Sequence, residues 1–334
     1  MSQQHLALYR KYRPSNFDDV VGQENAINVL TSSIKQKKIS HAYLFCGGRG
    51  TGKTTMARIF AREIGCNPED IIEIDAASNR GIDEIRELRD AVRTAPFSSP
   101  YKVYIVDEAH MLTKEAANAL LKTLEEPPSH VIFILATTDP EKLPATIVSR
   151  CQKITFASPD LPTLAQRLLY VAKEEGKKLD EESAFLIARH GKGSYRDALG
   201  VLEQVLSVSA TTINHKDVAL FIGQPEKETL LSLLTDLCKK DAKGIISTIE
   251  KLEKNTDSQR AYDEIIEMVR EALLGRIGEN SKVPPELLAL GKEFPLVINS
   301  KLILNLLGKR HYLGVSHTHG WIAFEAVLLS EISS

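Results

Sequence analysis

The segment GGRGTGKT at residues 47–54 matches G-x-x-x-x-G-K-[S/T], the pattern of a phosphate-binding loop. It follows a predicted strand that ends at Cys46 and precedes a predicted helix, which is the context that such a loop needs. Glycines let successive backbone N–H groups turn toward one phosphate, and the helix N-terminus adds partial positive charge. Lys53 is expected to reach the β- and γ-phosphates, and the Thr54 hydroxyl to ligate Mg²⁺. The residues predicted to hold the nucleotide here are Gly47, Gly48, Gly50, Thr51, Gly52, Lys53, Thr54 and Thr55.

A second segment, VYIVDE at residues 103–108, delivers two acids at the end of an apolar strand. Ligands of open α/β sheets bind at the carboxyl ends of the strands, so Asp107 and Glu108 are expected beside the phosphate loop. Asp107 is expected to hold the hydration shell of Mg²⁺, and Glu108 to polarise the attacking water as a general base. The two segments together predict binding and hydrolysis of ATP. The tetrad DEAH at 107–110 also occurs in helicases, but those need two tandem motor domains and this chain has one phosphate loop.

Three further polar residues are candidates for coupling the nucleotide to the rest of an assembly. Thr138 closes the apolar segment VIFILATT, where its hydroxyl either senses a γ-phosphate or caps a turn. Arg150 lies between two predicted elements and is either a surface ion-pair partner or an arginine finger that stabilises the transferring phosphate. Arg196 follows Ser194, a predicted helix N-cap, in a first turn where the helix dipole favours acids. An arginine placed against that preference indicates a role at the nucleotide, with a salt bridge to Asp197 as the alternative.

The elements that must position these residues alternate between short strands and helices up to about Phe156. Apolar runs rich in β-branched and aromatic residues predict strands buried on both faces of a parallel sheet, with helical patterns between them. After Phe156 the strand patterns stop, and apolar residues recur at three- and four-residue spacing. Gly176, Gly191 and Gly193 are expected to end or separate the first of these helices. The predicted strands are residues 42–46, 70–74, 102–106, 131–135 and 153–156.

This pattern predicts an α/β P-loop domain with a parallel sheet, a small helical lid domain and an all-α C-terminal domain. The expected boundaries are 1–157 for the nucleotide-binding domain, 158–221 for the lid and 222–334 for the C-terminal domain. The length of 334 residues suits two or three domains.

Composition excludes several classes of protein. The 42 Lys and Arg nearly balance 44 Asp and Glu, which excludes a uniformly basic nucleic-acid-binding protein and leaves local patches for any contact with DNA. No apolar run approaches the roughly 20 residues that span a bilayer, and the N-terminus has no apolar signal core. We therefore expect a cytoplasmic protein with no membrane partner. The four cysteines form no C-x-x-C pair, which predicts reduced and mostly buried thiols.

Taken in order, these features resemble the AAA+ ATPases, and specifically the gamma/tau family of bacterial DNA polymerase III clamp-loader subunits. The resemblance rests on long segments as well as on the generic motifs, and it covers most of residues 8–200. The C-terminal third matches only in length and helical character. The matching segments are LYRKYRPSNFDDVVGQENA at 8–26, EIDAASNRGIDEIRELRD at 73–90, HMLTKEAANALLKTLEEPPSHVIFILATTDPEKLPATIVSRC at 110–151 and GSYRDAL at 193–199.

The resemblance implies a role for each matching position. Asp107 and Glu108 would be the Walker B pair. Thr138 would be sensor 1 and Arg196 sensor 2, while Arg150 would be a finger that acts in trans on a neighbouring subunit. The residues that would border the adenine are Tyr9, Arg13 and Val21.

The resemblance also implies partners. The helical C-terminal domains of this family form a collar that holds a pentameric ring of clamp-loader subunits around primed DNA. The expected work is to open a sliding clamp and place it on that DNA as part of DNA polymerase III, whose nucleotidyl transfer belongs to another subunit. Polymerase and single-strand-binding protein are further expected partners, and the expected location is cytoplasmic and nucleoid-associated. Arg80 and Arg86 lie in the segment that tracks DNA in related loaders, where a phosphate contact at a helix start needs no base readout. Ion pairs with Asp83 or Glu87 are the alternative.

The chain departs from the family at one place. The family usually inserts a four-cysteine zinc module between the first helix and the next strand, but AREIGCNPEDIIEIDAAS at 61–78 runs straight through and keeps only Cys66. We therefore expect no structural zinc. The departure leaves open an archaeal or eukaryotic type of small loader subunit, and another AAA+ DNA-processing ATPase is the wider alternative. The chain ends soon after its helical third, so the long tail of a tau form is not expected in it.

Overall fold

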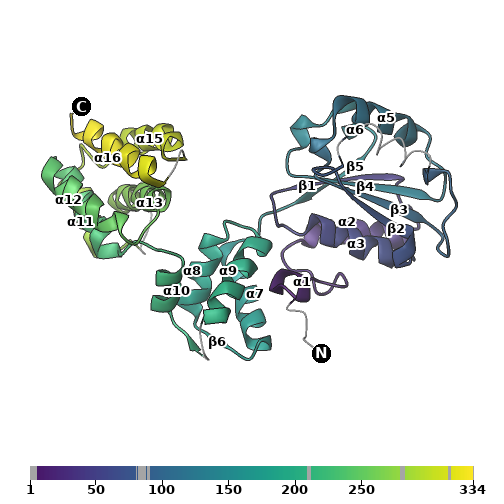
Figure 1. The fold of residues 1–334 in the computed structure, drawn as a ribbon, viewed down its shortest axis with the longest axis horizontal. Helices are drawn as coiled ribbons and strands as arrows, with labels where there is room; N and C mark the ends of the chain where they lie inside the picture. Colours follow the sequence, from purple (N-terminus) through teal and green to yellow (C-terminus); the bar gives the residue numbers. More distant parts are fainter. Residues whose placement is uncertain are drawn as a thin grey trace. The chain divides into compact units, whose positions relative to one another are not determined.

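The computed structural model of the 334-residue chain describes residues 6–79, 81, 88, 91–208, 212–278, 283–314 and 317–333. The chain forms two compact units, Met1–His215 and Lys216–Ser334 (Figure 1). The first unit holds the predicted sheet and the helices that directly follow it, and the second unit is helical throughout its described elements.

Five parallel strands form the sheet of the first unit, in the order β2-β3-β4-β1-β5. The predicted α/β fold with a parallel sheet is therefore confirmed. Because all strands run the same way, the carboxyl ends of β1 and β3 meet at one edge, on either side of β4. The phosphate loop follows β1 and the acid pair ends β3, so strand order alone brings them together. The strands are β1 Ala42–Gly47, β2 Ile71–Asp75, β3 Lys102–Asp107, β4 Val131–Thr137 and β5 Gln152–Phe156.

Helices cover both faces of this sheet (Figure 1). Side chains alternate across a strand, so the apolar run of β1 feeds two cores. Tyr43 and Phe45 pack with Phe60 of α3 on one face, whereas Leu44 packs with Leu120 of α5 on the other. The uninterrupted apolar strands are thus explained by a core on each side. The helices are α2 Glu24–Lys35 and α3 Lys53–Glu63 on the first face, and α5 Lys114–Glu125 and α6 Ala145–Val148 on the second.

Two details of the strand prediction are wrong. Burial on both faces fails at the edge of the sheet, where Lys153 and Thr155 of β5 are exposed, because an edge strand is covered less completely than a central one. Strands also do not stop at Phe156, since Lys178–Leu179 (β6) pairs in parallel with Thr212–Ile213 (β7). Strands of two residues are too short to show a periodic pattern in the sequence.

Three described helices follow the sheet within the first unit, and a short helix lies near the N-terminus, before α2. Asp160, Asp180 and Ser194 cap the three, each accepting a hydrogen bond from the backbone N–H three residues further on. The predicted N-cap at Ser194 is confirmed, and two helices end just before Gly176 and Gly191 as predicted. The short α1 packs against α9. These helices are α1 Leu8–Lys11, α7 Leu161–Glu174, α8 Glu181–His190 and α9 Tyr195–Val208.

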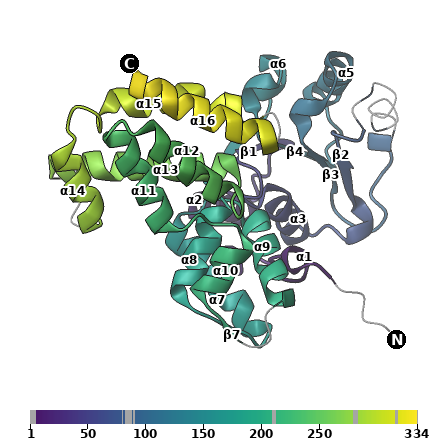
Figure 2. The same cartoon turned by 60° about the vertical axis from the view of Figure 1, so that its left-hand side comes forward.

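The second unit packs its helices around the long α13, Ser258–Ile277 (Figures 1 and 2). The Tyr262 ring of α13 meets Phe324 of α16 edge to face, with centroids 5.2 Å apart, and its hydroxyl donates to the Leu306 carbonyl of α15 at 2.8 Å. One buried aromatic residue thereby ties three helices together. No described helix of the chain is both long and apolar enough to cross a membrane. The remaining elements are α10 His215–Phe221, α11 Lys227–Cys238, α12 Ala242–Glu253, α14 Pro285–Glu293, α15 Ser300–Lys309, α16 His317–Ser333, and the 3₁₀ segments Pro68–Asp70, Ala109–Met111, Pro140–Lys142 and Arg310–Gly314.

Candidate nucleotide-binding site

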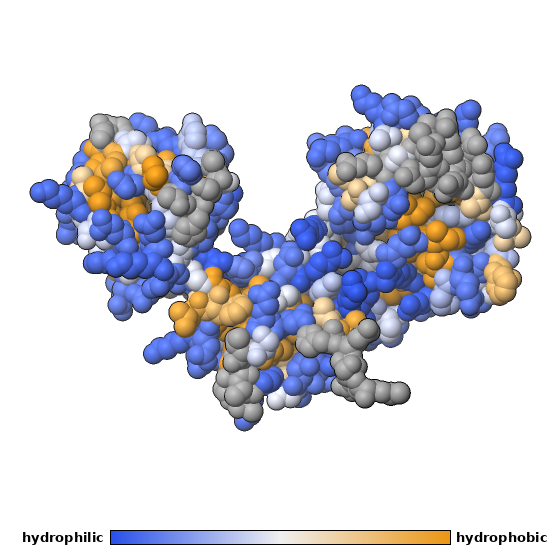
Figure 3. Space-filling view, in the orientation of Figure 1, coloured by the Kyte–Doolittle hydropathy of each residue, from blue (hydrophilic) through white to orange (hydrophobic). Residues whose placement is uncertain are grey.

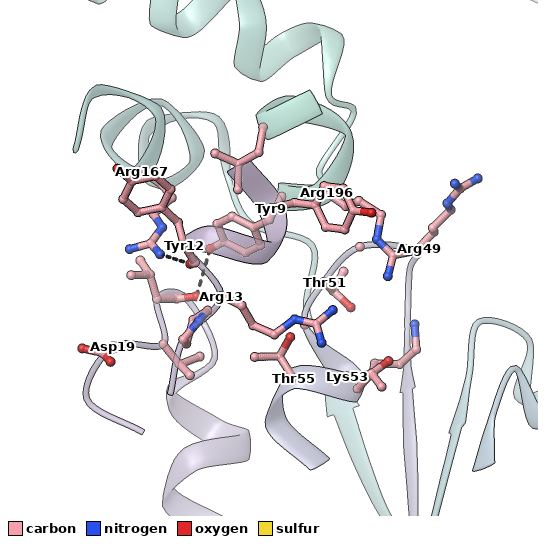
Figure 4. A pocket seen from close by; sticks show the side chains of 18 of the residues that line it. Tyr9, Tyr12, Arg13, Asp19, Arg49, Thr51, Lys53, Thr55, Arg167 and Arg196 are labelled. Atoms are coloured by element: carbon pink, nitrogen blue, oxygen red, sulfur yellow. Dashed lines mark hydrogen bonds between the residues drawn. The ribbon is translucent and has the colours of Figure 1, made fainter. Parts of the chain in front are cut away.

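A cavity that is partly open to solvent lies at the carboxyl edge of the sheet in the first unit (Figure 4). Its walls come from distant parts of the sequence: the N-terminal segment, the phosphate loop with the start of α3, the end of β3, and helices α7 and α9. The predicted site residues that line it are Tyr9, Arg13, Val21, Gly50, Thr51, Gly52, Lys53, Thr54, Thr55, Asp107, Glu108 and Arg196.

Lys53 is held inside the phosphate loop, with 6% of its surface exposed. Its Nζ donates to the carbonyl oxygens of Gly47 at 2.9 Å and Gly48 at 2.8 Å. Burial lowers the pKa of Lys53, and the carboxylates of Glu108 and Asp107 oppose that shift. A phosphate can replace these carbonyl contacts favourably, because a hydrogen bond to an ionised acceptor is roughly twice as strong as one to a neutral acceptor.

Thr54, in the first turn of α3, and Asp107, at the end of β3, place two oxygen atoms that can ligate a metal side by side. The Thr54 hydroxyl donates to Asp107 Oδ2 at 2.6 Å, and the other carboxylate oxygen accepts the backbone N–H of Glu108 at 2.9 Å. A hydroxyl beside a carboxylate is the hard-oxygen donor set that Mg²⁺ prefers. These two residues therefore fit a magnesium ion.

Glu108 is held in an unusual backbone conformation, with φ 48° and ψ 43°. The left-handed region is unfavourable for a residue other than glycine, and such strain gathers at functional sites. The Glu108 Oε2 lies 3.4 Å from Thr138 Oγ1 and 3.5 Å from His110 Nδ1. His110 Nδ1 also lies 3.0 Å from the buried Thr137 hydroxyl. The ends of β3 and β4 thus fix the direction of the Glu108 carboxylate.

The first turn of α9 closes one side of the cavity. The Tyr195 N–H donates to the Gly50 carbonyl at 3.1 Å, and its hydroxyl donates to the Val21 carbonyl at 2.9 Å. The guanidinium carbon of Arg196 lies 5.6 Å from the centre of the Tyr9 ring, within the range of a cation–π contact. The N-terminal segment, the phosphate loop and the first turn of α9 are therefore in direct contact.

Gly50 leaves no room for a side chain at this contact. Its φ is +70°, and a Cβ placed on it would lie 2.0 Å from Ser194 Oγ and 3.0 Å from Ser194 Cβ. A side chain at position 50 would therefore require the Ser194 hydroxyl to move away from the loop.

Five basic residues line the cavity: Arg13, Arg49, Lys53, Arg167 and Arg196. Burial lowers the pKa of Arg13, followed by repulsion from Arg58 and then from Arg196, with Glu73 opposing. Figure 4 shows the Arg13 guanidinium pointing toward Thr55 at the start of α3. Positive groups that repel one another in a partly buried site are stabilised by a polyanion, and a nucleoside triphosphate supplies that charge.

Four predicted site residues lie outside the cavity walls: Gly47, Gly48, Thr138 and Arg150. The carbonyls of Gly47 and Gly48 accept the bonds from Lys53. Thr138 contacts the site through Glu108, as described above. The Arg150 Nη2 donates to Glu125 at 2.6 Å and Nη1 donates to the Thr146 carbonyl at 2.8 Å, so Arg150 forms the surface ion pair that the sequence left as an alternative. The predicted DNA contacts at Arg80 and Arg86 lie outside the described residues.

The sequence analysis missed several residues that shape the site. Tyr195 stands next to Arg196 in the segment GSYRDAL, so the segment marked the place but not the residue. Arg49 occupies a variable position of the loop pattern, and Arg167 of α7 donates to the Tyr12 carbonyl at 2.6 Å across 155 positions of sequence. No local pattern reveals such pairs. The cavity-lining residues not predicted are Tyr12, Pro14, Asp19, Val20, Arg49, Arg167, Tyr195 and Leu199.

A short connection joins α3 to β2, at the position where the family usually inserts the zinc module. The Cys66 thiol is buried and donates to the Tyr101 carbonyl at 3.2 Å, and burial raises its pKa to about 11. The Asp70 carboxylate accepts the N–H groups of Phe97 at 2.6 Å and Ser98 at 3.1 Å. Burial alone would raise the pKa of Asp70, but these hydrogen bonds hold it below its usual value. The described residues contain no group of three or more His, Cys, Asp or Glu side chains arranged to hold a metal ion.

The sheet order, the phosphate loop after β1, the acid pair after β3 and the helical segment that closes the cavity define a P-loop protein of the AAA+ ATPase fold. Solved structures agree. Thermotoga maritima RuvB, described as a Holliday junction branch migration motor, superposes with a TM-score of 0.53 at 21% identity over 68% of this chain and 79% of its own. A point mutant of the same protein gives a TM-score of 0.54 at 20% identity, over 67% of this chain and 80% of its own. These likenesses establish the fold alone.

Sequence comparison defines the family. Residues 22–80 and 67–160 match the model of the DNA polymerase III delta subunit, and residues 163–211 match the ATPase lid domain of the DNA polymerase III clamp loader subunit. The chain is 38% identical to the DNA polymerase III subunit gamma of Buchnera aphidicola, over 74% of each chain. It is 39% identical to subunit tau of Bacillus subtilis, over 97% of this chain and 63% of that one. The chain belongs to the gamma/tau family of DNA polymerase III subunits, as the sequence resemblance predicted, and it spans less than two thirds of the Bacillus subtilis relative.

Proposed function

We propose that this chain is an ATP-hydrolysing motor subunit of a replicative clamp loader, which opens a sliding clamp and places it on primed DNA. The observation that carries the proposal is the convergence of Lys53, Asp107, Glu108 and Arg196 on one cavity. A non-hydrolysing subunit would have no need for both a phosphate-binding lysine and a strained general base.

The reaction follows from the side chains at the cavity. Mg²⁺ would be held by Thr54 and Asp107, where it neutralises charge on the β- and γ-phosphates. Lys53 and Arg196 bind phosphate oxygens and stabilise the charge that develops as the γ-phosphate leaves. Glu108 accepts the proton of the attacking water, and Thr138 orients that carboxylate and contacts the γ-phosphate. Tyr9, Arg13 and Val21 border the base and ribose, and Tyr9 holds Arg196 by its ring face.

Arg150 completes the site of a neighbouring subunit. In this chain it is paired with Glu125, and 34% and 48% of the two side chains are exposed. An ion pair as exposed as this contributes only about 0–1 kcal/mol, so a neighbour's triphosphate competes for the guanidinium at little cost. Arg150→Ala should leave ATP binding unchanged and lower turnover. In mixtures with Glu108→Gln subunits, turnover should be restored at some interfaces. There the Glu108→Gln subunit supplies an intact Arg150 to a neighbouring Arg150→Ala subunit that keeps Glu108.

We further propose a division into a nucleotide-binding domain at 1–157, a lid at 158–221 and a collar domain at 222–334. The collar would hold the chain in a pentameric ring with other loader subunits. Figure 3 shows apolar surface on the second unit. Leu304 and Leu307 of α15 and Ile322 of α16 are 68%, 50% and 60% exposed, which supports this assignment. Exposed apolar side chains on neighbouring helices mark interaction surfaces. Arg80 and Arg86 are proposed to contact the DNA backbone, with polymerase and single-strand-binding protein as further partners at the nucleoid.

The test is ATP turnover in the reconstituted loader, with and without its clamp and primed DNA. Wild-type protein should be stimulated severalfold by the two together, and Lys53→Ala should bind no ATP and show no stimulation. Lys38→Ala, at an exposed lysine three residues after α2, is the matched control. A wild-type loader that binds ATP but is not stimulated by clamp and DNA would refute the clamp-loading function.

A further inference from the structure

Gln23 is a buried amide that joins the phosphate loop to the segment leading into α7. Only 4% of its surface is exposed. Its Nε2 donates to the Thr51 carbonyl at 3.3 Å and to the Ala157 carbonyl at 2.7 Å, and its Oε1 accepts the Ala157 N–H at 3.2 Å. Ala157 lies directly after β5, at the start of the connection to the helices that close the cavity. Both ends of one side-chain amide are therefore occupied by backbone groups of two separate segments.

The hydrogen bond from Gln23 to the Thr51 carbonyl orients the peptide between Thr51 and Gly52 in the phosphate loop. The Thr51 carbonyl and the Gly52 N–H belong to one planar peptide and point in opposite directions. A donor that holds the carbonyl outward thus directs the Gly52 N–H inward, toward the position of the phosphates. Thr51 itself is buried, with 1% of its surface exposed, so no solvent is available to replace the Gln23 amide.

The bonds to Ala157 act on the connection to the lid helices, which is packed against the same loop. Gly47 pairs with Phe156 at the end of β5, where an added Cβ would lie 2.4 Å from the Phe156 carbonyl, and a Cβ on Gly48 would lie 3.4 Å from Ser158 Oγ in the connection. The loop and the connection thus lie side by side, directly beyond the paired ends of β1 and β5. The lid helix α9 is held to the loop at a second point, where Tyr195 donates to Gly50.

We infer that Gln23 is a positioning residue that transmits phosphate binding at the loop to the lid helices. When phosphates order the Thr51–Gly52 peptide, the Gln23 amide orders Ala157 and so fixes the direction in which α7 leaves the sheet. This role rests on the proposed nucleotide site and adds to it the mechanical connection between that site and the lid.

The test is hydrogen exchange of a peptide covering residues 157–168, with and without saturating Mg²⁺ and a non-hydrolysable ATP analogue. In wild-type protein the analogue should slow exchange there about tenfold, the effect of one hydrogen bond of ordinary net strength. Gln23→Met keeps the volume and removes all three bonds. It should bind the analogue up to about tenfold more weakly, and at saturation the analogue should slow exchange less than about twofold. Gln36→Met, at the exposed C-cap position that follows α2, is the matched control.

Gln23→Glu keeps the acceptor for the Ala157 N–H and removes both donors, so it should also lose the slowing. Slowing of wild-type size in either folded variant would overturn the inference, as would wild-type protein that binds the analogue without any slowing. Failure of both variants to fold would also overturn it, because Gln23 would then be structural only. Wild-type protein that does not bind the analogue would instead refute the proposed nucleotide site.

Discussion

Replacing Gly50 by alanine tests the close approach between the phosphate loop and the start of α9. The glycine has φ +70°, and an added Cβ would lie 2.0 Å from Ser194 Oγ. Two costs follow. An alanine in the left-handed region costs about 1–2 kcal/mol. The Ser194 hydroxyl must also swing away and lose its capping bond to the Asp197 N–H, now 3.1 Å long, which costs about 0.5–2 kcal/mol.

Gly176 provides the matched control for this prediction. It has φ +71° with no atom within 4 Å of an added Cβ, so alanine there carries the backbone cost alone. Gly50→Ala should therefore destabilise the first unit by about 0.5–2 kcal/mol more than Gly176→Ala does. It should also weaken ATP binding by about tenfold or more, because displacing α9 withdraws Arg196 and a hydrogen bond to a charged group is worth about 1.5–3 kcal/mol.

Urea denaturation followed by circular dichroism measures the stability of both variants, and a fluorescent ATP analogue measures binding. The sole tryptophan, Trp321, lies in the second unit, so its fluorescence reports separately that this unit is unaffected. Equal stability and equal affinity of Gly50→Ala and Gly176→Ala would refute the reasoning, since the contact with Ser194 would then carry no energy.

Three further changes have defined outcomes. Tyr9→Leu removes the cation–π contact to Arg196, which is worth about 0.5–2 kcal/mol. It should weaken binding of an ATP analogue about two- to thirtyfold, whereas Tyr9→Phe should leave the affinity unchanged. Equal affinities of the two variants would contradict the contact. Asp70 has a lowered pKa in the folded chain, so its stabilisation is present above its unfolded value near 4 and is lost as the pH falls through the folded value. Asp70→Asn should therefore flatten the dependence of urea stability on pH between about 5 and 2, and an unchanged slope would exclude this role. Glu125→Gln should leave stability within about 1 kcal/mol of wild type and raise loader turnover by releasing Arg150, while lower turnover would mean that Glu125 orients the finger instead.

The local parts of the site could be predicted from the sequence. The phosphate loop and the Asp107–Glu108 pair are contiguous patterns, and the strand–helix alternation around them fixes the parallel sheet. Strand order then brings the two together without any long-range information beyond the fold. The N-cap at Ser194 was predictable for the same reason, because a cap bonds to a backbone group only three residues away.

The connections between segments could not be predicted in this way. Gln23 and Ala157 are bonded across 134 positions, and nothing near either residue indicates the other. The left-handed backbone of Glu108 is imposed by the junction between β3 and the 3₁₀ turn that follows it, not by any preference of glutamate. The ion pair of Arg150 with Glu125 likewise depends on how α5 and α6 pack, which the sequence leaves open.

The most direct test of the account is ATP turnover and binding by Glu108→Gln. A general base contributes about 10²–10⁴ in rate, so the variant should bind ATP as tightly as wild type and hydrolyse it at least about 100-fold more slowly. Glu115→Gln, an exposed glutamate in the first turn of α5, is the matched control and should turn over normally. Equal turnover by the two variants would contradict the claim that this cavity hydrolyses ATP through Glu108.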